Sequence, residues 1–402
     1  VGHPRIHWCS GLGSYGRLEA FGGTKHAEEM SRFRFTALTF SLVLGATSAA
    51  WAQTDTTSED DFSQYANVGF ADAGSKRFCS PKIEGLSPAK LISIGYDFQA
   101  PYTANAGALA STIAGNDLFG AESANVRSTD GLRLACNIPV VSKTNLVWQM
   151  GANYWNTQYR YEDPANLVNP VNQSLAQFGL RTAGINTTLF KPLNQKEFIL
   201  FQGSADLSGT YNLNLQPARF LKYSAAVIYG RRPSEKKQWG VGVARTYRVG
   251  ELNYIPVVLY NATDARNKWG VEMLFPARAH VRYAINPRNL LFAGFELEGQ
   301  SYRLWNNPVS DSSAQMDLRG EELEIRRGEI RARLVYECSL KNFVWMSLQA
   351  GYRVNYRYDV DRLVDGAEIY RAFGILRDDP YAVTNSLGNP FYVNLSFNLV
   401  SP

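Results

Sequence analysis

The sequence predicts an all-β protein, a transmembrane antiparallel up-and-down β-barrel of about fourteen strands that follows a cleaved signal peptide. Three observations support this prediction. Segments of roughly ten residues alternate apolar and polar side chains with a period of two, the pattern of a strand whose faces meet different surroundings. Turn-forming residues separate these segments, and the links between them alternate between short and long. A signal for export precedes the first segment.

The export signal lies at residues 30–52. Two arginines give it a positive start, the apolar run that follows is too short to span a bilayer, and the sequence AWA before Gln53 provides a cleavage site. Residues 1–29 precede Met30 and show no membrane or fold pattern. We therefore interpret 1–29 as an unstructured stretch that arises from too early a start of translation.

The chain after the signal divides into two parts. Residues 53–85 are polar and have no clear period, which indicates a flexible periplasmic segment. Residues 86–402 contain all the alternating segments and form the predicted outer-membrane barrel. No apolar run reaches the roughly 20 residues that a membrane helix needs, so strands are the elements expected to cross the bilayer.

The composition excludes several classes of function. A net charge of +5 over 402 residues gives no basis for nucleic-acid binding. Cys79, Cys136 and Cys338 follow the signal, and an odd number of cysteines in an exported chain argues against a disulfide framework. One histidine and three scattered cysteines cannot build a zinc site, so we expect no metal and no cofactor.

The strands follow from the alternation, taken along the chain. The segment 91–98, LISIGYDF, places its isoleucines, tyrosine and phenylalanine on one face. The segment 391–399, FYVNLSFNL, is apolar on one face and amide-lined on the other. The weakest boundary lies at Pro276, because two strands nearly touch there and proline cannot donate to a ladder. The pattern predicts about fourteen strands, and twelve is the alternative. The fourteen predicted strands are 90–102, 127–141, 145–161, 175–190, 197–211, 219–231, 237–249, 252–262, 267–276, 277–286, 289–304, 321–339, 343–358 and 390–400.

The connections give an independent check on this architecture. Outer-membrane barrels have short turns at the periplasmic end and long loops outside, whereas a soluble sandwich gives no reason for that asymmetry. The links at Gly250-Glu251 and Pro276 are short on the outer side and break the rule. The other links obey it, with short turns at 142–144, 191–196, 286–288 and 340–342 and long loops at 103–126, 162–174, 212–218, 305–320 and 359–389.

Aromatic residues gather near the predicted strand ends. Tryptophan and tyrosine favour the bilayer interface, because the ring is apolar at one end and forms hydrogen bonds at the other. We therefore predict aromatic girdles, although aromatic residues are common in all β-proteins. The candidates are Trp148, Tyr154, Tyr159, Tyr223, Tyr229, Trp239, Tyr254, Trp269, Tyr283, Tyr336, Tyr352 and Tyr356.

The chain resembles the uncharacterised outer-membrane β-barrel families of Gram-negative bacteria. The stretch FPARAHVRYAI at 275–285, followed by NPRNLLFAGFELEGQSY at 286–302, is similar to one such domain-of-unknown-function family. The resemblance covers most of 86–399. It implies an architecture and an outer-membrane location, and it brings no assigned function.

Charged side chains occupy the strand face that the alternation assigns to the lumen. Opposite charges on neighbouring strands can pair across the roughly 5 Å between opposed residues, which predicts a salt-bridge mesh that stiffens the barrel. The alternative is a polar constriction that selects small solutes by charge. The predicted lumen-lining residues are Glu272, Arg278, His280, Arg282, Glu296, Glu298, Glu329, Arg331, Arg333, Glu337, Arg353 and Arg357.

The case for an enzyme is weak. His280 is the single histidine after the signal, and no serine stands at a motif-like spacing from it. Glycine pairs such as those in GVGVAR at 240–245 alternate with valine, as strands do, and are not phosphate loops. We therefore expect no enzymatic activity and no catalytic residues.

These observations favour a monomeric integral outer-membrane barrel that acts as a narrow charge-lined passive channel or as a structural surface protein. Its expected partners are outer-membrane lipid, the barrel-assembly machinery and small solutes. The alternative is a transporter for hydrophobic compounds, since fourteen strands is also the count of fatty-acid uptake barrels, which carry an N-terminal plug and a lateral wall opening. The segment 53–85 is short and polar for a plug. A lipid-modifying barrel enzyme, with His280 as its base, is the third hypothesis.

Overall fold

The computed structural model describes residues 83–110, 117–210, 220–304, 322–363, 370–372 and 379–400. The predicted upstream stretch 1–29, the predicted signal 30–52 and most of 53–85 lie outside these residues.

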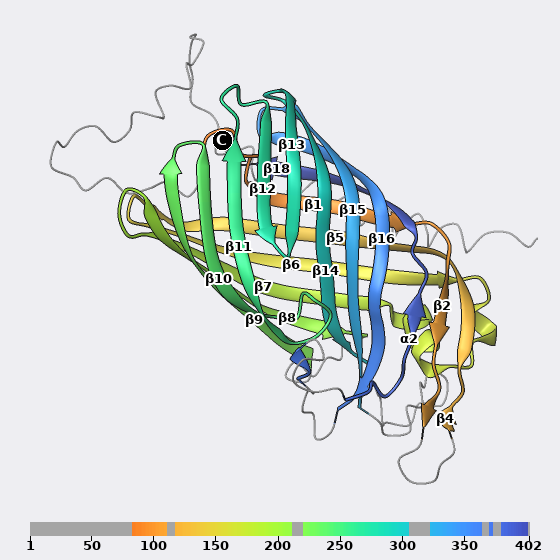
Figure 1. Ribbon diagram of the computed structural model, residues 1–402. Helices are drawn as coiled ribbons and strands as arrows, with labels where there is room; N and C mark the ends of the chain where they lie inside the picture. Colours follow the sequence, from red (N-terminus) through yellow and green to blue (C-terminus); the bar gives the residue numbers. More distant parts are fainter. Residues whose placement is uncertain are drawn as a thin grey trace, which may run out of the picture. The chain divides into compact units, whose positions relative to one another are not determined.

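Fourteen antiparallel strands form a closed barrel in the described chain (Figure 1). Sequential strands are neighbours from β5 to β16, β18 follows β16, and the sheet closes because β1 pairs with both β18 and β5. The prediction of fourteen strands is confirmed, and the alternative of twelve is wrong. The barrel strands are β1 (Lys90–Gln99), β5 (Glu122–Lys143), β6 (Leu146–Tyr161), β7 (Leu180–Pro192), β8 (Glu197–Gly209), β9 (Leu221–Ser234), β10 (Lys237–Thr246), β11 (Asn253–Thr263), β12 (Trp269–Phe275), β13 (Arg278–Asn286), β14 (Asn289–Arg303), β15 (Leu323–Lys341), β16 (Val344–Arg362) and β18 (Phe391–Val400).

The alternation places apolar side chains on the outside of the barrel. In β18, Phe391, Val393, Leu395, Phe397 and Leu399 are exposed, and the residues between them are buried in the interior. Exposed apolar side chains continue around the outer surface, on β1, β9, β10 and β13 among others. A surface of this kind is stable in hydrocarbon rather than in water, so the strands span a membrane. No helix in the described chain is long and apolar enough to cross a bilayer.

The aromatic residues divide between the two faces. Tyr223, Tyr254 and Tyr352 are exposed on the outer surface near the end with the long connections, here called the long-loop end. Trp239 and Trp269 are exposed near the opposite, short-turn end. The expected girdle therefore has members at both ends of the strands. Tyr159 does not belong to it, because its side chain is buried inside the barrel.

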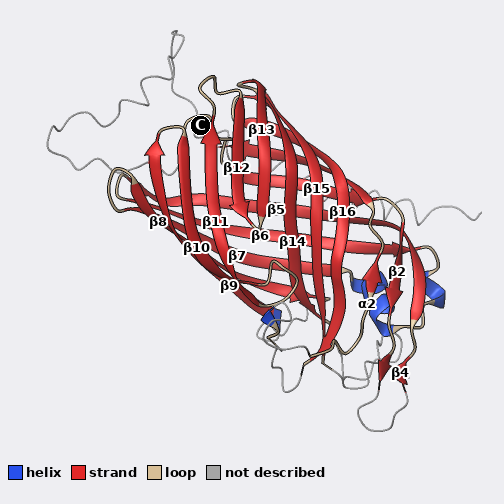
Figure 2. Ribbon diagram, viewed as in Figure 1, coloured by secondary structure: helices blue, strands red, loops and turns tan. Residues whose placement is uncertain are grey.

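A helix and extra strands cover the long-loop end (Figure 2). The predicted strand 175–190 begins as a helix, because Asn169, Pro170 and Gly179 are a good N-cap, first helical residue and C-cap. The predicted loop 103–126 is also partly extended, and it pairs with the start of β5. These elements are α2 (Pro170–Phe178), β2 (Tyr102–Ala106), β3 (Leu109–Ala110), β4 (Asp117–Phe119), β17 (Ser386–Leu387) and a 3-10 turn at Pro164–Asn166.

We expect the cap of α2 to be measurable. The Asn169 side chain accepts a hydrogen bond of 3.0 Å from the Val171 amide, and its own amide nitrogen donates to two backbone carbonyls at Gly107 and Gly120. Asn169→Ala should destabilise this cap by about 1–2 kcal/mol. Limited proteolysis of the folded barrel should then cleave between β6 and β7 faster than in the wild type, while Asn166→Ala, at an exposed position, should not. Equal cleavage rates would contradict the capping role.

The wall of the barrel is interrupted beside the β12–β13 hairpin. β12 pairs with β11 only over Val258–Thr263, and β13 pairs with β14 only as far as Glu296. The neighbouring stretches 253–257 of β11 and 297–303 of β14 extend beyond the hairpin tip at Pro276. Beyond the tip, neither β12 nor β13 pairs with these stretches. The hairpin ends below the long-loop end, so the link at Pro276 only has to connect two adjacent strands and is short.

The β10–β11 loop, residues 247–252, lies against the outer face of β14 and β15 above this hairpin. Ser301 Oγ donates to the Gly250 carbonyl at 3.2 Å, and Tyr356 donates to the Val249 carbonyl at 2.9 Å. Gly250 has φ +95°, which favours glycine, and a Cβ at Gly299 would lie 2.5 Å from the Gly250 nitrogen. At the long-loop end β14 also pairs directly with β8, through Arg303 and Gly209, so β9–β13 are bypassed there.

The residues before β1 lie at the short-turn end. Ile83 is buried, and the Glu84 amide donates to the Glu235 carbonyl at 2.7 Å. Ser87 donates from its amide and its hydroxyl to Glu272 on β12. Because β12 is far from β1 in the sheet order, this segment runs across the barrel from one wall to another. The last residues of the segment predicted to be flexible, 83–85, therefore have defined contacts.

Candidate functional site

Seven charged side chains meet inside the barrel, and we call them the lumen belt. They come from β1, β5, β14, β15 and β16, where each stands between outward-facing residues. On β15, for example, Glu329 and Arg331 point inward, whereas Leu334 of the opposite parity is exposed outside. The lumen belt consists of Asp97, Arg133, Glu298, Arg327, Glu329, Arg331 and Arg353.

Arg133 carries the ion pairs across the lumen. Its two terminal nitrogens donate to the Glu298 carboxylate at 2.7 and 3.0 Å, and its Nε donates to Asp97 at 2.5 Å. Arg133 lies on β5 and Glu298 on β14, and four strands separate them in the sheet. A bidentate arginine–carboxylate pair fixes both distance and orientation. This pair therefore holds two distant parts of the wall together.

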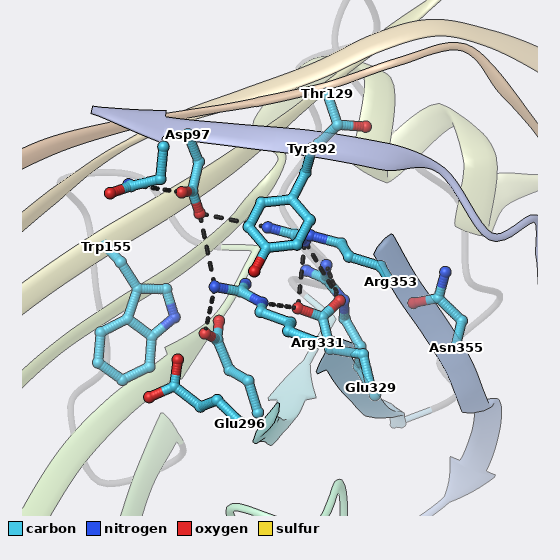
Figure 3. Close-up of polar contacts among 12 residues, drawn as sticks. Asp97, Thr129, Trp155, Glu296, Glu329, Arg331, Arg353, Asn355 and Tyr392 are labelled. Atoms are coloured by element: carbon cyan, nitrogen blue, oxygen red, sulfur yellow. Dashed lines mark hydrogen bonds and ion pairs between the residues drawn. The ribbon is translucent and has the colours of Figure 1, made fainter. Parts of the chain in front are cut away.

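Glu329 is the centre of the buried half of the belt (Figure 3). Its carboxylate accepts from Arg327 at 2.9 Å, Arg331 at 2.6 Å and Arg353 at 3.1 Å. Arg353 also donates to Asp97 at 3.2 Å, and its guanidinium lies 4.9 Å from the Tyr392 ring centroid. Burial, shared carboxylates and an aromatic face together hold these cations in one arrangement.

The remaining predicted lumen residues fall into separate groups. The Arg333 Nε donates to His280 Nε2 at 3.0 Å, and Arg333 also pairs with Glu296. Arg282 pairs with Glu272 at 3.0 Å. His280, Arg282 and Glu272 belong to the β12–β13 hairpin itself, which contributes no residue to the lumen belt.

Two more predicted residues lie at the edges of the lumen. Glu337 pairs with Lys90 at 2.6 Å near the short-turn end. Arg278 is exposed beside the hairpin tip, where β13 begins. The predicted residues therefore do not form a single cluster.

Arg357 differs from its predicted position. A β-bulge in β16 sets Gly328 opposite Arg357 but Glu329 opposite Asn355, so the parity shifts by one residue. Arg357 consequently lies on the outer face of the sheet and pairs with Glu251 of the β10–β11 loop. The alternation alone could not reveal this shift.

A second buried set of charges, the outer ion cluster, lies on that outer face beneath the β10–β11 loop. Glu324 accepts from Lys222 and pairs with Arg326, both at 2.5 Å, and Asp361 pairs with Arg326 at 3.1 Å. Glu324 and Arg326 are fully buried although they share the parity of lipid-facing residues. The outer ion cluster consists of Lys222, Glu251, Glu324, Arg326, Arg357, Asp361 and Arg371.

The loop beyond β16 completes the outer ion cluster. Arg371 donates to both oxygens of Asp361 at 2.7 Å. Tyr381 donates to Glu251 at 3.0 Å. Burial, together with that carboxylate, raises the pKa of Tyr381 to about 12. The hydroxyl therefore remains a hydrogen-bond donor at physiological pH.

Sequence reasoning missed Asp97, Arg133 and Arg327 of the belt and most of the outer cluster. Asp97 and Arg133 stand on the polar parity of segments already identified as strands, so the same rule would have found them. For the outer cluster the signal is in β15, where charges occupy both parities from Glu324 to Arg327. A strand charged on both faces must be covered by protein on both faces.

A cavity of about 610 Å³ lies beside the belt. One part of its lining is apolar and includes Ile228, Ile255, Val257, Leu274 and Leu297. Another part carries amides and hydroxyls. The lining also includes the hairpin tip, so the cavity reaches the place where the wall is interrupted. The polar lining residues are Ser93, Asn137, Asn153, Asn186, Thr188, Gln202 and Ser204.

Arg248 is one of the arginines that line this cavity, and its side chain is 38% exposed. Its guanidinium lies 4.8 Å from the Trp155 ring centroid and 3.4 Å from Asp206. Among the residues that the structure describes, no group of three His, Cys, Asp or Glu side chains has the geometry of a metal site. The chemistry that the cavity offers is thus burial of apolar surface with a polar rim.

The fold, the apolar outer surface and the charged interior define an integral outer-membrane β-barrel protein. No protein-family model matches the chain, and no curated protein matches its sequence.

Solved structures similar to this chain have low sequence identity to it. They include the COG4313 outer membrane channel from Pseudomonas putida F1, with 12% identity and a TM-score of 0.32 over 79% of this chain and 97% of that chain. The Pseudomonas putida toluene transporter TodX has 9% identity and a TM-score of 0.30, over 78% of this chain and 90% of that chain. A Pseudomonas aeruginosa FadL homologue has 7% identity and a TM-score of 0.35, over 79% and 91%. Superpositions this loose transfer no function.

Proposed function

We propose that this protein is an outer-membrane transporter for small, mainly apolar compounds. The single observation that supports the proposal is the cavity beside the lumen belt, which is apolar on one part of its lining and reaches the interrupted wall. An apolar molecule gains about 25 cal/mol for each Å² of apolar surface that it buries. The aliphatic lining can supply that burial, and the amide and hydroxyl lining can orient a polar substituent.

The interrupted wall suggests how such a compound would leave the cavity. Leu297 and the hairpin tip at Pro276 line the cavity where β11 and β14 lose their hairpin neighbours. A compound that moves past this point reaches the hydrocarbon of the membrane without crossing the charged belt. An apolar compound is favoured on such a route because no part of it has to be hydrated.

A narrow charged channel is the second candidate, and the lumen belt favours it. Its cations and carboxylates are paired with one another, however, and the pair between Arg133 and Glu298 crosses the lumen. Paired, buried charges attract a passing ion less than an open ring of one sign. Planar-bilayer recordings test this candidate directly, since discrete ion-conducting openings would favour it over the transporter.

The transporter is tested by blocking the cavity. Ala226 lines the cavity, whereas its neighbour Val227 is exposed on the outer surface. Ala226→Trp should lower the rate at which intact cells producing the protein take up N-phenyl-1-naphthylamine by about tenfold, the effect of roughly 1.4 kcal/mol on a barrier. The matched control Val227→Trp should leave the rate unchanged. Unaltered uptake by a correctly folded Ala226→Trp barrel would refute the proposal.

A further inference from the structure

Buried hydrogen-bond donors converge where the lumen belt meets the long-loop end. The Tyr159 and Tyr358 side chains are 2% and 3% exposed. Neither hydroxyl has a hydrogen-bond partner within the described chain, and the same is true of the Nε atoms of Arg327 and Arg353 and of Nη2 of Arg331. Five donor groups therefore remain unsatisfied in one buried region, which is unusual in a folded protein.

The backbone register brings these donors together. Arg327 of β15 is paired with Tyr358 of β16 on one side and with Gln300 of β14 on the other. Tyr159 and Tyr358 belong to one buried cluster, which also contains Tyr302 of β14. The two hydroxyls without partners in the described chain and the Arg327 Nε therefore lie in the same buried region.

The carboxylates nearby are already occupied. Glu329 accepts from Arg327, Arg331 and Arg353, and Asp97 accepts from Arg353, Arg133 and Asn394. Glu298 accepts from both Arg133 and Arg331 at 2.7 Å, so it is shared as well.

The lumen belt, taken as one network, therefore contains four guanidiniums and three carboxylates. Five of its seven members, Arg327, Arg331, Arg353, Asp97 and Glu329, are between 1% and 6% exposed. One positive charge is left without a carboxylate of its own. An uncompensated charge is very costly in such surroundings.

We propose that the barrel binds one small monovalent anion, of the size of chloride, between Arg327 and the hydroxyls of Tyr159 and Tyr358. Hydroxyl and guanidinium donors are the groups that coordinate such an anion. The anion both balances the excess positive charge and accepts hydrogen bonds from the unsatisfied donors. Water could accept from the donors, but it would leave the charge uncompensated.

The test uses the full-length wild-type barrel, purified and stored in halide-free buffer. Its midpoint of thermal unfolding is measured while sodium gluconate is replaced by sodium chloride or sodium bromide at constant ionic strength. We expect a saturable rise with either halide, and none with acetate, which is larger and planar. The same midpoint in every salt would overturn the proposal. A linear rise without saturation would do so too, because it would indicate a general salt effect.

A pair of variants assigns the effect to this place. Tyr159→Phe combined with Tyr358→Phe removes both hydroxyls and should weaken the apparent affinity for bromide at least tenfold. Tyr96→Phe, on the exposed outer face, should leave it unchanged. If the double variant does not fold, crystals of the wild type grown in sodium bromide decide the question. An anomalous bromine peak beside Arg327 supports the site, and a peak height typical of water there refutes it.

Discussion

Glu329→Gln is expected to destabilise the barrel by about 3–5 kcal/mol, the usual cost of leaving buried charge without its partner. The carboxylate holds Arg327, Arg331 and Arg353, and glutamine keeps the shape while it removes the charge. Urea unfolding in lipid vesicles, followed by tryptophan fluorescence, measures the free energy of unfolding. The barrel should also lose part of its heat-modifiable migration on gels when assembled in cells.

Glu337→Gln is the matched control for this experiment. Glu337 is also an inward-facing carboxylate of β15, but its partner Lys90 is about two-fifths exposed. Partly solvated ion pairs contribute about 0–1 kcal/mol, so this variant should unfold nearly as the wild type does. Equal destabilisation by both substitutions would show that the burial of Glu329 and its three arginine partners do not account for the loss of stability.

Glu324→Gln is the second substitution with a large expected effect. Glu324 is fully buried on the outer face of β15 and pairs with Lys222 and Arg326. Its loss again leaves buried cations undercompensated, for a cost of about 3–5 kcal/mol. Because Lys222 lies on β9, the β9–β11 region should also separate from β14 and β15, which faster hydrogen exchange of the β10 and β11 amides would detect.

Charge balance distinguishes this effect from a simple packing defect. In the double variant Glu324→Gln with Lys222→Met, the remaining cation Arg326 still pairs with Asp361. We expect the double variant to recover more than half of the stability lost by Glu324→Gln. If it is less stable than the single variant, the contacts of the Lys222 side chain rather than its charge hold this region together.

Most of the fold could be predicted because lipid and lumen impose opposite demands on successive side chains. The strand at 391–399 is the clearest case, with every apolar residue outside and every amide inside. The rule fails where neither face meets lipid. Gly299, Ser301 and Glu324 belong to the outer parity but are covered by the β10–β11 loop, and no local pattern announces a distant loop.

Local chemistry explains two other differences. Residues 169–179 contain an N-cap asparagine, a proline and a C-cap glycine, and this combination indicates the helix α2 even within a chain of strands. The alternation predicts Arg357 in the lumen, and this prediction is wrong because a single extra residue in β16 cannot be recognised from sequence. The members of the candidate site were predictable as inward-facing charges, but their partners were not, since these depend on contacts across the barrel.

The direct pairing of β14 with β8 at the long-loop end has a mechanical consequence. Where β14 pairs with β8, the five strands β9–β13 no longer contribute to the circumference of the barrel. The circumference is therefore smaller at the long-loop end than at the short-turn end. The opening at the long-loop end is therefore bounded by fewer strands than the opening at the short-turn end.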